Sequence, residues 1–368
     1  MKSTIFIVPF NALIDDICDY STQTMRILAE KKNFVVGVAL GNPFSLFHDF
    51  SGFLKKNFLI KKSKNYFIFR PIMFIPGQRF ELVKKLNLVI NIFLLNLAFL
   101  SNKKRRRIMW FFEPKYSSVF LKFLYRDRSV FDCVDHFSFY ENLKAEHQLA
   151  LKKFDQVFVN STTLKKAYQH LREDIKKVPL GFYSPPLKLK TKNQSRKKRL
   201  VFVGGIGSRI DFSFIMKLIE SNSNFELTLI GPLSFSTQKL TDLKSKKLFL
   251  KLVAEKKIFW LDKIAKDKIT TTVSNYDIGL IPYKKTAFNL NSFPMKVMEY
   301  FYVGLPVIST FIKELSYYPD HVYFPEVNGW QGINSFLNKS LVLLSAKRKI
   351  ALKNSWEKKV DQILNNLF

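Results

Sequence analysis

Short apolar runs alternate with amphipathic stretches along the first half of the chain. Runs with the length of a buried strand lie at residues 5–9, 34–40, 66–69, 107–112, 130–134 and 156–159. Apolar positions three and four apart predict helices at 22–32, 81–100, 141–153 and 162–171. This regular β-α-β-α order predicts an α/β fold with a largely parallel sheet and right-handed crossovers.

A polar segment divides the chain. Residues 183–199, YSPPLKLKTKNQSRKKR, hold two prolines followed by a basic tract, which is typical of an extended linker. The alternation then restarts, with strands predicted at 200–203, 225–230 and 258–261, helices at 211–220 and 264–274, and two amphipathic helices within 334–367. A chain of 368 residues exceeds one ordinary core, so we predict a first domain at 1–182, a linker at 183–199, a second domain at 200–350 and a C-terminal helix at 351–368.

Residues 277–310 predict a complete β-α-β unit. Apolar strands at 278–282 and 306–310 flank a polar loop at 283–291 and a helix at 295–303. The triplet Ser292-Phe293-Pro294 offers a hydroxyl near the cap and a proline in the first turn, and Gly304 ends the helix.

One face of that helix carries candidate chemistry. Lys296, Glu299 and Tyr300 share it, whereas Met298 and Phe301 belong to a stripe that can face the core. The pattern is compatible with a solvated lysine–glutamate pair. It is also compatible with a nucleoside diphosphate site, in which Lys296 contacts the phosphates and Glu299 accepts hydrogen bonds from ribose hydroxyls.

The motif P-x-K-x-x-E-Y at 294–300 is preceded by D-I-G-L-I-P-Y and followed by L-P-V-I-S-T. This segment resembles the nucleotide-sugar-binding segment of GT-B glycosyltransferases, above all the bacterial enzymes that build polysaccharide, capsule and lipid-linked glycans. The resemblance implies the GT-B fold, with two Rossmann-like domains facing across a cleft and a final helix that often crosses back to the first domain. It also implies that Lys296 serves the donor diphosphate and Glu299 the ribose. We expect Tyr283 and Met295 to line the base or sugar pocket.

One position departs from the family pattern. Many retaining members carry a second glutamate eight residues before the first, and here that position is Asn291. The donor sugar and the stereochemical outcome therefore stay open.

A glycine turn follows the first strand of the second half. Gly204-Gly205-Ile206-Gly207 allows a ligand to approach the backbone closely, although a tight turn needs the same residues. Arg209 is expected either to bind donor phosphate or to be a solvated loop charge.

Two acids and a histidine end a strand of the first half, in Phe131-Asp132-Cys133-Val134-Asp135-His136-Phe137. The stretch is similar to a D-x-x-D-x-[FW] segment of GT-B enzymes that act on polysaccharides. A carboxylate or an imidazole at the carboxyl edge of the sheet can deprotonate an acceptor hydroxyl. We predict Asp135 as the catalytic residue and His136 as the second candidate, with turn and helix-cap roles as the alternative. Glu113, before a proline, is a weaker candidate.

Composition narrows the class of partner. The formal net charge of +31 predicts an anionic partner, such as phosphorylated substrates, a membrane surface or nucleic acid. Two cysteines give no disulfide framework or zinc spacing, which fits a cytoplasmic protein. No D-x-D motif occurs, so we predict metal-independent transfer with no cofactor beyond the nucleoside-diphosphate sugar.

Basic pairs flank the apolar segment at 86–100, LNLVINIFLLNLAFL. This segment is too short for a spanning helix and contains three asparagines. We interpret it as a core or interfacial helix, at an anionic inner membrane face or within a solvated basic surface. Nucleic-acid binding would be indicated by a sheet with aromatic residues for base stacking or by the ligand spacing of a zinc site. The sequence pattern contains neither.

The sequence therefore predicts a cytoplasmic, peripheral membrane glycosyltransferase. It would move a sugar from a nucleotide sugar to a glycan or lipid-linked acceptor in cell-surface polysaccharide synthesis. Two other hypotheses stay open: a non-catalytic GT-B-like accessory subunit, and a basic nucleic-acid-binding protein.

Overall fold

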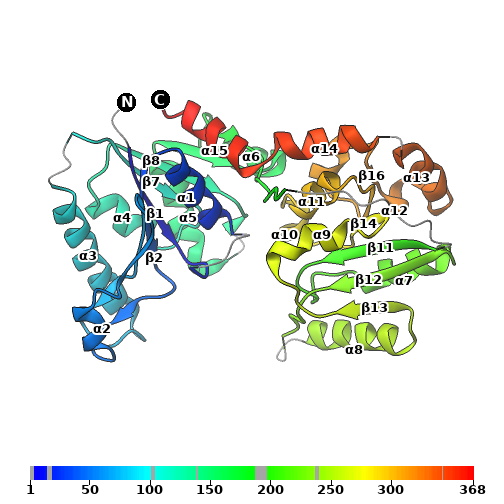
Figure 1. Cartoon of the computed structure of the whole chain (residues 1–368), viewed down its shortest axis with the longest axis horizontal. Helices are drawn as coiled ribbons and strands as arrows, with labels where there is room; N and C mark the ends of the chain where they lie inside the picture. Colours follow the sequence, from blue (N-terminus) through cyan, green and yellow to red (C-terminus); the bar gives the residue numbers. More distant parts are fainter. Residues whose placement is uncertain are drawn as a thin grey trace. The chain divides into compact units, whose positions relative to one another are not determined.

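The computed structural model describes residues 4–14, 19–100, 104–137, 140–186, 197–236, 240–341 and 343–368. The chain forms two compact units (Figure 1). The first comprises Met1–Leu180 and Trp356–Phe368, and the second comprises Gly181–Ser355. Part of the predicted linker, residues 187–196, lies outside the described residues.

An eight-stranded sheet forms the centre of the first unit. Its strands follow the order β10-β9-β8-β7-β1-β2-β5-β4, and all neighbours are parallel except β4 and β5. The strands are β1 (Ile5–Phe10), β2 (Phe34–Ala39), β4 (Leu59–Ser63), β5 (Tyr66–Phe69), β7 (Arg107–Phe111), β8 (Arg128–Cys133), β9 (Gln156–Val159) and β10 (Lys176–Lys177). The strand order reverses at β1, which has β2 on one side and β7 on the other. This reversal is the point at which open α/β sheets bind ligands.

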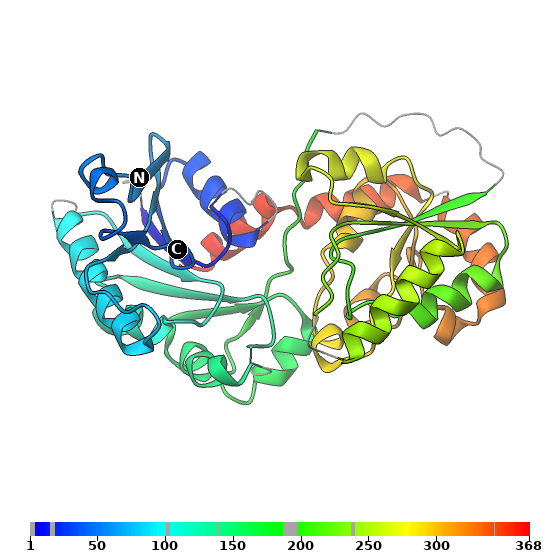
Figure 2. The same cartoon turned by 90° about the horizontal axis from the view of Figure 1, so that it is seen from below.

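Helices cover both faces of this sheet. Helix α1 (Tyr20–Glu30) lies beside α15 (Trp356–Asn365) on one face (Figures 1 and 2). The other face carries α3 (Glu81–Ala98), α4 (Ser117–Phe123) and α5 (Glu141–Lys153), which contact one another in sequence. The remaining elements are β3 (Phe44–Ser45), α2 (Phe50–Leu54), β6 (Ile72–Met73) and α6 (Thr162–Tyr168).

A buried ion pair ties the last helix to the first unit. The Nζ atom of Lys359 on α15 lies 2.8 Å from Oδ1 of Asp132 on β8, and both side chains are almost completely buried. Burial raises the pKa of the Asp132 carboxyl, and the charge of Lys359 opposes that rise. Asp132 lies at the carboxyl end of β8 as expected, but its side chain is fully buried and is not open to a ligand, contrary to expectation. The side chain points into the layer under α15, where removal of either partner would leave an uncompensated charge.

The second unit contains a six-stranded parallel sheet. Its strands are β11 (Lys198–Val203), β12 (Phe225–Ile230), β13 (Ile258–Leu261), β14 (Ile278–Ile281), β15 (Val307–Ser309) and β16 (Val322–Tyr323). The order β13-β12-β11-β14-β15-β16 is the 3-2-1-4-5-6 order of dinucleotide-binding sheets. The order reverses between β11 and β14, whose residues Leu200 and Ile278 are paired. A ligand site is therefore expected beyond the carboxyl ends of these two strands.

The helices of the second unit connect these strands and extend beyond them. They are α7 (Phe212–Ser221), α8 (Leu240–Ala254), α9 (Ile269–Val273), α10 (Ala287–Leu290), α11 (Lys296–Tyr302), α12 (Pro325–Asn328), α13 (Ile333–Leu341) and α14 (Leu344–Lys353). Asp211 caps α7 by accepting from the Phe214 amide, as the sequence predicted.

Three details of the second half differ from the sequence predictions. The helix expected at 264–274 is divided into a 3₁₀ turn, Lys266–Lys268, and the short α9. The tail forms three helices, α13 to α15, rather than two. Helix α11 begins at Lys296 without a side-chain cap, since the Ser292 hydroxyl donates to the Asn289 carbonyl within the preceding turn.

Candidate functional site

The glycine turn after β11 meets the first residue of α11 at the reversal point of the second sheet. Gly204 has φ +144°, a backbone conformation that favours glycine. A Cβ atom at this position would lie 2.7 Å from both Cε and Nζ of Lys296. The missing side chain therefore leaves the space that the lysine occupies. The structure thus brings two predicted donor-binding residues together from segments about ninety residues apart.

A second glycine, which the sequence analysis did not single out as a site residue, completes this turn. Gly231 follows β12 and also has φ +144°. A Cβ atom there would lie 2.1 Å from the Gly204 carbonyl oxygen, so the two turns pack backbone to backbone. The Gly231-Pro232 pair directly after a strand was the available signal.

Two cations contact the same tyrosine ring beside this turn. Lys296 Nζ lies 5.7 Å from the Tyr283 ring centroid, and the Arg209 guanidinium lies 4.9 Å from it. Nε of Arg209 also donates to Oδ1 of Asn289 at 3.0 Å, and its guanidinium lies 4.7 Å from the Phe288 ring. Within the described part of the chain neither cation forms an ion pair with an acid. The pair therefore presents positive charge suited to an anionic ligand.

Glu299 lies one turn along α11 from Lys296. Its side chain is half-buried, and burial raises the pKa of the carboxyl while the charge of Lys296 opposes the rise. No hydrogen bond to its carboxylate is formed by any residue that the structure describes. An acceptor that is half-buried and unused by the protein suits a ligand hydroxyl.

Tyr300 does not share the ligand face with Lys296 and Glu299, contrary to expectation. Its ring is fully buried against Gly279 of β14, where an added Cβ would lie 2.3 Å from the ring. Its hydroxyl accepts from the Val203 amide and donates to the Leu280 carbonyl, both at 3.3 Å. Tyr300 thus anchors α11 to β11 and β14, and this contact positions Lys296 and Glu299.

The remaining predicted donor residues lie around this turn. Gly205 is exposed beside Ser234, and a Cβ there would lie 3.1 Å from the serine hydroxyl. Met295 is half-buried and immediately precedes α11. Thr310, at the end of the L-P-V-I-S-T motif, donates to the Tyr283 carbonyl at 2.7 Å and fixes that loop. The donor-binding roles of these residues stay predictions.

Replacing Gly204 with alanine is expected to weaken nucleotide binding as well as stability. The new methyl group would displace the Lys296 ammonium group, and the backbone conformation would add about 1–3 kcal/mol of strain. Gly77→Ala is the matched control, because Gly77 also has positive φ but a Cβ there would meet no atom closer than 3.5 Å. Thermal unfolding with and without UDP separates the effects. A Gly204→Ala protein that gains as much stability from UDP as the wild type would contradict this prediction.

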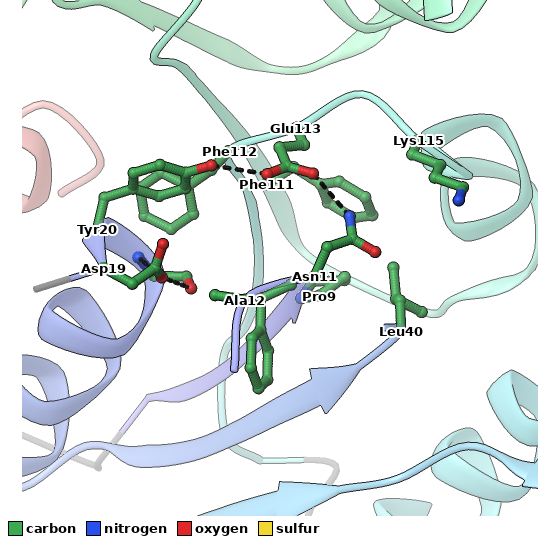
Figure 3. Close-up of a pocket in the computed structure, with 12 residues that line it drawn as sticks. Pro9, Asn11, Ala12, Asp19, Tyr20, Leu40, Phe111, Phe112, Glu113 and Lys115 are labelled. Atoms are coloured by element: carbon green, nitrogen blue, oxygen red, sulfur yellow. Dashed lines mark hydrogen bonds between the residues drawn. The ribbon is translucent and has the colours of Figure 1, made fainter. Parts of the chain in front are cut away.

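A polar cluster lies at the reversal point of the first sheet (Figure 3). Asn11 directly follows β1, and its Nδ2 donates to Oε2 of Glu113, which follows the adjacent β7, at 2.7 Å. The hydroxyl of Tyr20, the first residue of α1, donates to the other Glu113 oxygen at 2.7 Å. Lys115 and Leu40 complete the lining of the small pocket above these groups. Glu113 therefore lies at the reversal point of the first sheet, as Lys296 lies at the reversal point of the second sheet.

The protonation states in this cluster follow from burial and neighbouring charge. Burial and the adjacent Glu113 charge raise the pKa of Tyr20 well above its ordinary value, so the phenol stays protonated and donates. Burial also raises the pKa of Asp19, although its carboxylate caps α1 by accepting from the Ser21 and Thr22 amides. A hydroxyl group that enters this pocket would thus meet the Glu113 carboxylate, which already accepts hydrogen bonds from Asn11 and Tyr20.

The predicted catalytic residues lie beside this cluster. Asp135 follows β8, one strand further from the reversal point, and its charge contributes to the raised pKa of Tyr20. The His136 ring packs 5.1 Å from the Tyr168 ring, and burial lowers its pKa, so the imidazole is neutral at pH 7. Catalytic roles for Asp135 and His136 stay predictions. The sequence analysis ranked Glu113 lower and missed Asn11 and Tyr20.

The described residues form no candidate metal centre. No three histidine, cysteine, aspartate or glutamate side chains among them converge as a metal site would require. Metal independence stays a prediction.

Comparison with known proteins places this geometry in a family context. Residues 185–319 match the family described as glycosyl transferases group 1. A stretch of 117 residues is 26% identical to TuaH of Bacillus subtilis, which is named as a teichuronic acid biosynthesis glycosyltransferase. This stretch is 32% of the present chain and 28% of TuaH, so less than two thirds of that relative is matched.

Solved structures resemble the chain over nearly its whole length. Sucrose-phosphate synthase from Thermosynechococcus elongatus superposes with a TM-score of 0.71 at 14% identity, covering 99% of this chain and 98% of that one. HepE of Anabaena, solved in complex with UDP, superposes with a TM-score of 0.67 at 14% identity, covering 99% of both chains. The predicted resemblance and the predicted GT-B fold of two Rossmann-like domains are confirmed. The expectation of a glycosyltransferase enzyme agrees with both comparisons.

Proposed function

We propose that the protein is a glycosyltransferase that moves a sugar from a nucleoside-diphosphate sugar to a lipid-linked or glycan acceptor in cell-surface polysaccharide synthesis. One observation carries the donor half of this proposal. Gly204, Lys296, Arg209 and Glu299 converge at the reversal point of a dinucleotide-binding sheet. There the Glu299 carboxylate is half-buried, and neither cation pairs with an acid among the residues that the structure describes.

The donor residues have distinct chemical tasks. Transfer breaks the bond between the anomeric carbon and the diphosphate oxygen, so negative charge develops on the leaving group. Lys296 and Arg209 stabilise that charge without a metal ion. Glu299 accepts hydrogen bonds from the ribose hydroxyls, and Tyr283 and Met295 line the base or sugar pocket. HepE, whose fold is similar, was solved in complex with UDP, which supports a nucleoside diphosphate as the ligand proposed here.

On the acceptor side, the protein has to receive the proton of the acceptor hydroxyl group. The acceptor oxygen forms the new bond to the anomeric carbon, and its proton passes to a carboxylate. We assign this role to Glu113, whose carboxylate is held by Asn11 and Tyr20. Asp135, with His136, is the alternative base from the sequence prediction.

Two further observations support the biological setting. TuaH is named for teichuronic acid biosynthesis, which favours a polysaccharide acceptor here. Exposed apolar residues of α3, with lysines nearby, favour attachment to the anionic inner face of the cell membrane. In the described residues, every helix is too short or too polar to cross a bilayer.

The test is thermal unfolding with UDP, GDP, ADP and CMP, each with and without EDTA. A nucleotide at one hundred times its dissociation constant adds about 2.7 kcal/mol to the folded state. We expect one diphosphate to stabilise the wild type regardless of EDTA, and Glu299→Ala to lose most of that shift. Glu326→Ala is the control, because Glu326 also belongs to the second unit but pairs with Lys285. The absence of a shift with every nucleotide would overturn the donor site.

A further inference from the structure

An open apolar groove lies on the α3 face of the first sheet. It has a volume of about 610 Å³, within the range of ligand sites, and every residue that lines it is apolar. Phe34 and Val36 of β2 and Phe67 and Phe69 of β5 form its floor, and Leu94 and Ala98 of α3 form one wall. The groove belongs wholly to the first unit. Such a large apolar surface open to solvent indicates a binding site.

The asparagine side chains of helix α3 face the protein. Asn87 accepts from the amides of Phe74 and Ile75 at 2.8 and 2.9 Å, and Asn91 exchanges hydrogen bonds with the Ile72 backbone at 2.8 Å. These bonds hold the segment that presents Ile72 and Phe74 to the groove. The asparagines that interrupt the apolar run in the sequence are therefore structural, and the outward face of the helix is apolar.

The outward face continues the apolar surface beside the groove. Leu82, Leu86, Phe93 and Leu97 recur four or seven residues apart along one side of α3 and are 70%, 46%, 61% and 45% exposed. A helix that places amides inward and leucines outward is unusual for a surface in contact with water. It suits a surface in contact with hydrocarbon.

The charge around the groove selects an anionic occupant. From residue 50 to residue 80 the chain carries seven basic side chains and no acidic one: Lys55, Lys56, Lys61, Lys62, Lys64, Arg70 and Arg79. A second copy of this chain would bring the same positive segment against itself, which costs electrostatic energy. An amphiphile with an apolar chain and an anionic head matches both the groove and its rim.

Pockets of increasing polarity lead from the groove to the cluster around Glu113. Ile72 lines both the groove and a second, small pocket, which also contains Lys84 and Tyr116. Leu40 lines that second pocket and also the pocket with Glu113 and Lys115. The order is thus an apolar groove, then Lys84, which pairs with the exposed Glu81 at 3.2 Å, and then Lys115, which lines the same pocket as the hydrogen-bonded Glu113 carboxylate.

We infer that the groove holds the hydrocarbon chain of a lipid-phosphate-linked acceptor, with the phosphate near Lys84 and Lys115 and the acceptor sugar at Glu113. This inference rests on the proposed glycosyltransferase function and names the acceptor class: a single-chain lipid carrying phosphate and sugar. The binding order of chain, phosphate and sugar matches the order of apolar, basic and carboxylate groups along the face of β2.

Isothermal titration with alkyl phosphates below their micelle concentrations tests the chain site. Octyl, decyl and dodecyl phosphate are titrated into the full-length protein, with inorganic phosphate and dodecyltrimethylammonium as arms that remove the chain or reverse the head charge. Each pair of CH₂ groups buried in the groove is expected to tighten binding about tenfold. Equal affinity for octyl and dodecyl phosphate, or preference for the cationic head, would overturn the inference.

Two groove variants and one control locate the binding. Ala98→Trp fills the groove, and Leu94→Asp places a charge at its wall; both residues are exposed, so folding is expected to persist. Each variant should weaken dodecyl phosphate binding at least tenfold. Leu243→Asp is the matched control, since Leu243 is a similarly exposed leucine on α8 of the second unit. Wild-type affinity in both groove variants would overturn the inference.

Vesicles and UDP distinguish the alternative outcomes. Binding to phosphatidylglycerol vesicles without binding of dodecyl phosphate would mean that this surface contacts a bilayer and holds no acceptor chain, which also overturns the inference. UDP should stabilise the groove variants as it does the wild type. If UDP fails to stabilise any of these proteins while dodecyl phosphate still binds, the proposed function fails and the groove remains a lipid site.

Discussion

Lys296→Met is expected to lower kcat of sugar transfer by about 10²–10³-fold, the usual cost of removing one group that stabilises developing negative charge. The ammonium group of Lys296 lies over the Gly204 turn and 5.3 Å from the Phe202 ring centroid, at the reversal point of the second sheet. Methionine keeps the length and apolar character of the side chain and removes its charge. The measurement is steady-state release of nucleoside diphosphate, with UDP-dependent stabilisation recorded for the same variant.

The control for this variant is Lys268→Met. Lys268 is an exposed lysine of the same unit, in the 3₁₀ turn before α9. If Lys296 acts through its charge, Lys296→Arg should retain more activity than Lys296→Met, although the larger guanidinium has to fit above Gly204. A Lys296→Met protein with wild-type kcat would exclude the lysine from transition-state stabilisation. Equal losses in the Lys268 and Lys296 variants would show only that positive charge in general assists the anionic donor.

The donor side could be predicted from the sequence because its chemistry lies within one continuous segment. The spacing of Lys296 and Glu299 places both on one helical face, and the strands on either side identify a β-α-β unit. Even so, Tyr300 was assigned to the wrong face. The spacing of three and four residues groups it with Lys296, but the space left by Gly279 on β14 accepts the ring in the core. A helical face is broad, and only packing decides which of its residues are buried.

The acceptor side could not be assembled from the sequence alone. Asn11, Tyr20 and Glu113 lie up to 102 residues apart, and their contacts depend on β1 and β7 becoming neighbours. A run of apolar residues predicts a strand but does not say where the strand lies in the sheet. The D-x-x-D motif therefore directed attention to the end of β8. Its first acid, Asp132, proved to be the buried partner of Lys359, a pairing that spans 227 residues.

One apolar segment of the sequence also allowed two interpretations, and only the structure distinguishes between them. The segment at 86–100 was compatible with a core helix or an interfacial one. In α3, Leu88 and Ile92 are buried whereas Leu86 and Phe93 are exposed, so the helix has an apolar inner face and an apolar outer face. Periodicity cannot identify such a helix as amphipathic, because its polar residues bind the backbone of the neighbouring segment.

Glu113→Gln is expected to lower kcat by about 10²–10⁴-fold, the usual contribution of a general base, while UDP binding stays unchanged. Glutamine has the same shape: its carbonyl oxygen can still accept from Asn11, and its NH2 group can donate to the Tyr20 hydroxyl oxygen, so the cluster should remain folded. What it loses is the ability to take the acceptor proton. The measurement is transfer of sugar from a labelled nucleotide sugar, with thermal unfolding as the check on folding.

Asp135→Asn, measured in parallel, decides which carboxylate is the base. The reversal point lies between β1 and β7, so Glu113 is placed where an acceptor is expected, and Asp135 is one strand away. Glu113→Gln should therefore have the larger effect, and Glu30→Gln, an exposed pair with Arg26 on α1, should have none. If Asp135→Asn removes transfer and Glu113→Gln does not, the motif at the end of β8 carries the catalysis and Glu113 only holds Tyr20. In the proposed mechanism one of these two carboxylates accepts the proton. If neither variant changes transfer, the proton leaves by another route and this part of the mechanism is wrong.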